Sequence, residues 1–171
     1  MPVRDRVAAA ALVAALLLTG CSPEAPPPPP ADTPGPMATP DAEEAAFRAA
    51  EATYRAYVDA LNARRANPAS PVDPETYLDA AAASSAESTA QDLLEAGMRV
   101  VGPTKVVWVA ASGKSRTGLV LRTCVDLSQT RLMGSENTDV TPASRPNRQV
   151  LAVTVSDVQM ITDIVVEPDP C

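Results

Sequence analysis

Alanine and valine divide this chain into two parts that favour different secondary structure. Residues 42–98 contain 18 alanines and two valines, whereas residues 99–171 contain four alanines and 14 valines. Alanine favours helix, and the β-branched side chain of valine favours strand. Because the helical part precedes the strand part instead of alternating with it, the sequence predicts an α+β fold with N-terminal helices packed on an antiparallel sheet.

Helical spacing and start signals locate the helices within the first part. Apolar residues at helical intervals predict a first helix over residues 41–65: Phe47, Ala50, Tyr54, Val58 and Leu61. Asp73 followed by Pro74 predicts the start of a second helix. We expect helix to restart at Ser84 or Ser85 and to end at Gly97.

The second part predicts four strands, over residues 99–110, 118–128, 149–156 and 158–166. Residues 112–114 are expected to form the turn between the first two strands, and residues 129–133 to extend the pairing. Strict alternation in the second strand places Leu121, Thr123 and Val125 on one face and Arg122 and Cys124 on the other.

The first 21 residues have the pattern of an export signal. Arg4 and Arg6 precede residues 7–18, which carry no polar side chain and are too few to span a bilayer, since a span needs about 20 residues. The segment closes with Leu18-Thr19-Gly20-Cys21, which resembles a bacterial lipobox, although Thr19 stands where alanine or serine is usual. The alternatives are an ordinary signal peptide or a buried helix, in either of which Cys21 is incidental.

The lipobox resemblance implies that the thiol of Cys21 receives a diacylglycerol and that cleavage makes this residue the new N-terminus. Two or more acyl chains, palmitate among them, would hold the protein stably on the extracytoplasmic face of the cell membrane. Residues 22–41 contain nine prolines and predict an extended tether that could reach roughly 60 Å. A PxxP-type ligand role for the prolines is the alternative.

Cys124 and Cys171 remain as an even pair in an exported chain, and we expect them to form a disulfide. Such a bridge would fasten the C-terminus to the sheet and stabilise the fold by roughly 4 kcal/mol. The alternative is two free thiols, one buried and one exposed.

Composition excludes several function classes. A formal charge of −7 argues against nucleic-acid binding, which needs clustered lysine and arginine. The chain has no histidine, the commonest general base and transition-metal ligand. Two paired cysteines without histidine make a poor zinc site. We therefore expect no cofactor, no metal and no enzymatic activity.

Residues 42–171 resemble the nuclear transport factor 2-like superfamily, also called SnoaL-like or cystatin-like, and the whole chain resembles small actinobacterial-type lipoproteins. The features that carry this resemblance are Tyr54-Arg55-Ala56-Tyr57, Val101-Gly102-Pro103-Thr104, Cys124-Val125-Asp126, Asn147-Arg148-Gln149 and Pro170-Cys171. The resemblance implies a cone formed by helices and a curved four-stranded antiparallel sheet, with acid–base groups inside it in the enzymes of the family. The candidate pocket residues are Tyr54, Tyr57, Trp108, Arg122 and Asp126. The alternative is that Arg122 and Asp126 form salt bridges to neighbouring strands or face solvent, and that Trp108 packs against the sheet.

These observations predict a membrane-anchored cell-envelope lipoprotein whose domain is a non-catalytic binding or scaffolding module for an envelope protein partner. One alternative is a carrier or weak enzyme with a small-molecule pocket in the cone. Another is a phage-encoded lipoprotein that excludes superinfecting phage.

Overall fold

Helices come first and strands second in the computed structural model, which describes residues 40–171. The order confirms the α+β class, with two α-helices and two antiparallel sheets among these residues. The predicted export signal, the lipidation residue Cys21 and all but the last two residues of the predicted tether lie outside the described residues.

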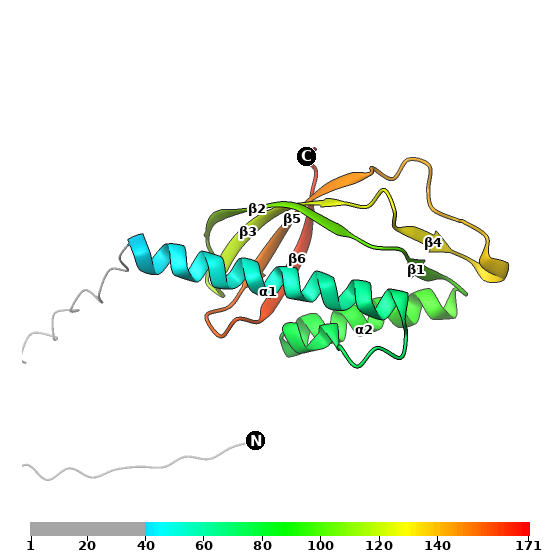
Figure 1. Ribbon diagram of the computed structural model, residues 1–171, viewed down its shortest axis with the longest axis horizontal. Coiled ribbons are helices and arrows are strands. Elements are labelled where there is room, and N and C mark those ends of the chain that lie inside the picture. Colours follow the sequence, from blue (N-terminus) through cyan, green and yellow to red (C-terminus); the bar gives the residue numbers. More distant parts are fainter. Residues whose placement is uncertain (1–39) are drawn as a thin grey trace, which may run out of the picture. The chain divides into compact units, whose positions relative to one another are not determined.

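Helix α1 (Pro40–Ala66) is the longest element and supplies one side of the core. Three of its four buried residues, Ala50, Tyr54 and Val58, lie at intervals of four, which places them on one helix face. The helix includes Asp41 in its first turn and Arg64 and Arg65 in its last. The charges at both ends therefore interact favourably with the helix dipole. Figure 1 shows α1 running along one face of the sheet, with α2 beside it.

The second helical region begins at different residues from those predicted. Asp73 does cap a turn, but this is a short 3-10 helix, η1 (Pro74–Tyr77), in which the Asp73 side chain accepts from the Glu75 amide. Helix α2 (Ala80–Glu95) starts at Asp79, whose side chain accepts from the Ala82 amide at 2.7 Å. Asp79 is free to cap because η1 ends just before it, whereas Ser84 and Ser85 lie inside the helix.

Four strands form the main sheet in the order β2 (Lys105–Lys114), β3 (Leu119–Asp126), β5 (Arg148–Val155) and β6 (Ile161–Glu167), all antiparallel. A two-stranded sheet pairs β1 (Arg99–Val101) with β4 (Arg131–Met133), which is followed by a 3-10 turn, η2 (Ser135–Asn137).

The predicted strand over residues 99–110 is therefore split between two sheets. Gly102 has φ +79 and lies so close to the Gln129 carbonyl that a Cβ there would be 2.0 Å from the oxygen. Pro103 follows it and offers no N–H to a ladder. Residues 112–114, predicted as a turn, continue β2 through a bulge between Ala111 and Gly113.

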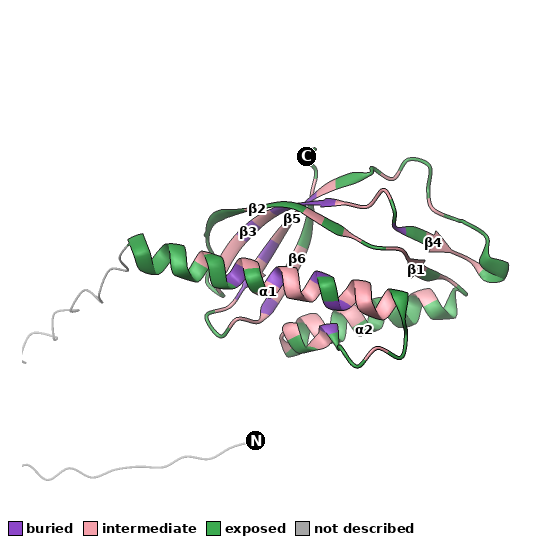
Figure 2. Ribbon diagram, viewed as in Figure 1, coloured by how far each residue is buried: buried purple, intermediate pink, exposed green. Residues whose placement is uncertain are grey.

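The core fills the space between α1 and the sheet. Leu121 and Val125 of β3, Val153 and Val155 of β5, and Ile161 at the start of β6 are all at most 2% exposed. They pack with the buried face of α1 and with Leu78. Figure 2 shows these buried residues on the strands and along the middle of α1, whereas α2 contributes no fully buried residue.

A polar cluster joins the end of α1 to the two connections that link the sheets. Asn62 both donates to the Thr104 carbonyl and accepts from the Thr104 amide. Arg65 donates to the Thr104 hydroxyl, and Arg145 donates to the carbonyl of Thr130. These bonds satisfy backbone groups where the chain leaves one sheet for the other.

Candidate functional site

The predicted pocket residues do not gather in one place. Tyr54 lies in the core at 2% exposure, and Tyr57 is half-buried one turn further along α1. Trp108, Arg122 and Asp126 lie on the opposite face of the sheet, because Cα partners in an antiparallel ladder share a face. Of the five predicted pocket residues, only Tyr54 is therefore buried between α1 and the sheet. Trp108, Arg122 and Asp126 face away from that space.

Tyr54 is a structural residue by its surroundings. Its hydroxyl hydrogen-bonds to the side chain of Thr123, and Thr123 in turn donates to the carbonyl of Trp108. Burial raises the pKa of Tyr54 to about 12, an effect that the bond to Thr123 opposes. The phenol is thus held neutral, inside the core and away from solvent.

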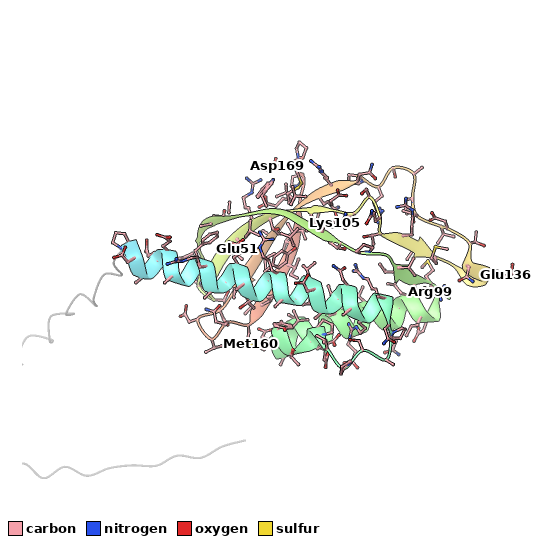
Figure 3. All side chains as sticks on the ribbon, in the orientation of Figure 1. Glu51, Arg99, Lys105, Glu136, Met160 and Asp169 are labelled. Atoms are coloured by element: carbon pink, nitrogen blue, oxygen red, sulfur yellow. A yellow bond between two sulfur atoms is a disulfide. The ribbon has the colours of Figure 1, made fainter. Side chains whose placement is uncertain are left out.

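Arg122 and Asp126 are each held by partners outside the core. Arg122 donates to Glu167 at 2.6 Å and to Asp169 at 2.9 Å, and the bond to Glu167 raises its pKa. The pKa of Asp126 is lowered, chiefly by the hydrogen bonds from Ser128. Figure 3 shows Asp169 on the side of the sheet away from α1, near the C-terminus.

The predicted disulfide between Cys124 and Cys171 is present, with the two Cα atoms 5.9 Å apart. Cys124 lies on the outer face of β3 yet is fully buried, whereas Cys171 is exposed. The C-terminal residues therefore lie against the outer face of the sheet, fixed by the disulfide and by the pairs of Arg122.

A groove of about 470 Å³ opens on the helix side of the sheet, between α2 and β6. Small residues of α2 form one wall: Ala81, Ala82, Ser85, Ala86 and Thr89. Thr162, Asp163 and Ile164 of β6 form the other, and Tyr57 and Leu78 also line the groove. Its volume falls within the 300–1,000 Å³ that is usual for binding sites.

Two residues that line this groove carry a polar group without a protein partner among residues 40–171. The Tyr57 hydroxyl makes no side-chain hydrogen bond there, although burial raises its pKa. The exposed carboxylate of Asp163 forms no ion pair with a described residue. The groove thus offers the neutral Tyr57 hydroxyl to a ligand, whereas the Asp163 carboxylate lies beside the groove, because Asp163 pairs with Thr154 and shares the outer face of the sheet with it.

The edge of β6 borders the same groove. β6 is the last strand of its sheet, so one side of its backbone faces away from β5. On that side only Ile161 is paired within the described residues: its carbonyl accepts from the Asp79 amide at 2.9 Å, and Leu78 forms a parallel bridge to it. The backbone groups of the following residues are left for another partner.

Sequence reasoning placed Tyr57 in a candidate pocket but included neither Asp163 nor any residue of α2 in it. Ser85 and Thr89, four residues apart on an alanine-rich helix, were the available signal, because such spacing puts small polar side chains on one face. Among residues 40–171 no group of three or more Cys, Asp or Glu side chains is arranged to hold a metal ion.

Comparison with protein-family models, with curated proteins and with solved structures finds no match to this chain. Within the part of the chain that the structure describes, no helix combines the length and apolar character that a membrane crossing requires.

Proposed function

We propose that this chain is a cell-envelope lipoprotein, anchored through Cys21 to the extracytoplasmic face of the membrane, whose folded domain binds a protein partner. The proline-rich residues 22–41 would hold the domain away from the bilayer. The binding role rests on one observation: an open groove beside the free edge of β6, with the unpartnered Tyr57 hydroxyl inside it.

We further propose that the fold is a filled variant of the nuclear transport factor 2-like cone. A long helix crossing a four-stranded antiparallel sheet supports this proposal. Where enzymes of that superfamily hold acid–base groups, this domain has Leu121, Val125 and Val153, each at most 2% exposed. The filled interior and the outward placement of Arg122 and Asp126 favour a non-catalytic role.

A small-molecule carrier is the second candidate, and the Tyr57 hydroxyl favours it. A phenol at the edge of an apolar groove could orient a small ligand through one hydrogen bond. The groove is open along β6, however, and a site that buries most of a small ligand would be more enclosed.

Membrane fractionation tests the anchor. Cys21→Ala removes the acceptor thiol, so the chain should move from the membrane to the soluble fraction. Thr19→Ala is the matched control: it brings the segment closer to the usual lipobox and should leave the chain with the membrane. A Cys21→Ala chain that still sediments with membranes would show that the anchor is elsewhere.

Site-specific photo-crosslinking in intact cells tests the groove. A benzophenone amino acid at Ser85 projects into the groove, whereas one at the adjacent Ser84 lies on the solvent side of α2, since Ser85 lines the cavity and Ser84 does not. Adducts of one defined mass are expected at position 85 and not at position 84. Equal adducts at both positions, or none at either, would reject the groove as the binding surface.

A further inference from the structure

We infer that the free edge of β6 accepts an extended, positively charged peptide segment of a partner protein as an additional strand. This inference rests on the proposed binding function and names its partner class. Strand addition uses main-chain hydrogen bonds for affinity and alternate side chains for specificity, so it requires an open edge, adjacent space and complementary charge.

A short segment of the chain itself pairs with the first residue of β6 and no further. Leu78 pairs in parallel with Ile161, and the next amide, that of Asp79, donates to the Ile161 carbonyl. Asp79 then caps α2, and the chain turns into the helix. The edge of β6 is therefore competent for pairing, and the rest of its length is left open at the point where the groove begins.

The two edges of the main sheet differ in how far they resist pairing. β2 carries lysine at both ends, Lys105 and Lys114, and two register irregularities, which are devices that discourage edge-to-edge association. β6 has no lysine and only one register irregularity, near its start, and its Val165 and Val166 are 50% and 56% exposed. An exposed apolar edge strand with less of this protection marks an interaction site.

Charge favours a cationic segment. Helix α2 and strand β6 together contain no lysine or arginine and five acidic residues, of which Glu167 is already paired with Arg122: Glu87, Asp92, Glu95, Asp163 and Glu167. Asp92 shares the helix face of Ser85 and Thr89, and Asp163, whose side chain lies on the outer face of the edge strand, forms no ion pair among residues 40–171. A second copy pairing β6 with β6 would bring like charges together, and this disfavours self-association through the edge.

The wall formed by α2 leaves room for side chains of an added strand. Every α2 residue that lines the groove is alanine, serine or threonine. Alternate residues of a strand laid along β6 would point toward this wall, and its small side chains would accommodate them. Residues 26–30 of the chain are an unbroken run of proline, which lacks the N–H that strand pairing needs, so the chain's own tether is a poor occupant.

The test uses the full chain in nonionic detergent and a fluorescent, acetylated eight-residue peptide of alternating valine and lysine. Fluorescence anisotropy should report binding that weakens with salt, and hydrogen exchange should show protection of amides in residues 161–167. The valine–glutamate peptide should not bind. The valine–lysine peptide with every residue N-methylated should bind about tenfold more weakly, because its backbone donors are gone.

Matched variants separate the contribution of the groove's open space to peptide binding from that of the Asp163 charge. Ser85→Leu fills the groove and should weaken binding about tenfold, whereas Ser84→Leu should leave it unchanged. Asp163→Asn should weaken it about threefold, and Asp157→Asn, in the adjacent turn outside the groove, should not. Thermal melts of all four variants identify any loss that comes from unfolding.

Several outcomes would overturn the inference. Equal affinity for the N-methylated peptide would mean electrostatic attraction without strand pairing. Protection of residues 105–114 would assign the peptide to β2. Self-association of the chain that Ser85→Leu abolishes would make a second copy the occupant. If crosslinks form at position 85 in cells but the chain does not prefer the valine–lysine peptide, the strand-addition inference is wrong and the binding function stands. If neither the crosslinks nor the peptide preference is observed, the binding function is wrong as well.

Discussion

Replacing Cys171 by serine removes the covalent link between the last residue of the chain and the centre of β3. The two cysteines are 47 residues apart in sequence, and the chain-entropy estimate for a loop of that size is about 4 kcal/mol. Cys171 is exposed, so the serine loses little besides the bond. Since a domain is stable by only about 5–15 kcal/mol, this loss is a large fraction of the total.

Urea unfolding of the full chain measures this loss. Trp108 is the only tryptophan, and it lies opposite Cys124 in the β2–β3 register, so its emission reports unfolding at the cross-link. With an m-value of about 2 kcal/mol/M, the Cys171→Ser midpoint should fall by about 2 M. Wild type with both thiols reduced should unfold at the same midpoint.

The control is Asp169→Asn, which removes only the outer ion pair of Arg122. The Asp169 side chain is 66% exposed, so the pair contributes less than about 1 kcal/mol. Its midpoint should shift by no more than about 0.5 M. If Cys171→Ser unfolds no earlier than Asp169→Asn, the argument that the disulfide acts by restricting the unfolded chain is wrong.

Three further substitutions test the fold. Two hydrogen bonds of 2.6 Å from Arg64 lower the pKa of Glu75 to about 2, below its unfolded value of 4.5. Their contribution is therefore complete above about pH 4.5 and is lost as the pH falls toward 2. Glu75→Gln should cost about 1 kcal/mol at pH 7, and acid-unfolding curves should show this difference vanish near pH 2.

Tyr54→Phe should cost about 1 kcal/mol in urea unfolding. Because the folded pKa of Tyr54 is about 12 against 10 unfolded, its stabilisation is complete below about pH 10 and is lost as the pH rises through 12. An ultraviolet titration in which all three tyrosines ionise near pH 10 in the folded chain would contradict its burial. Gly102→Ala should destabilise by well over 1 kcal/mol, because its Cβ would meet the Gln129 carbonyl, whereas Gly97→Ala, with φ +67 and open space, should cost about 1 kcal/mol. Equal midpoints for the two would refute the steric argument.

Local patterns in the sequence predicted the elements well where neighbours along the chain decide the outcome. The helix-then-strand order follows from alanine and valine content, and the alternation in β3 placed Leu121, Thr123 and Val125 on one shared face, all of them buried in the structure. The start of α2 was misplaced, because whether Asp79 or a later serine caps it depends on where η1 ends. The early end of β1 depends on the approach of Gly102 to Gln129, far along the sequence.

The predicted pocket residues show the same difference between what local patterns predict and what long-range packing decides. Tyr54 and Tyr57 belong to one short motif, yet one is buried against Thr123 and the other lines the groove, because each meets different strands and helices across the fold. Arg122 and Asp126 share a strand face, as alternation required. That this face is the outer one depends on α1, which packs against the opposite face.

The sequence by itself determined the class of the fold, the residues of the disulfide and the absence of histidine chemistry, because these depend on composition and on spacing within single elements. The tertiary structure alone decided that the interior is filled and that a groove forms between α2 and β6. The two walls of that groove are about 80 residues apart in sequence, and long-range packing, which no local pattern records, brings them together.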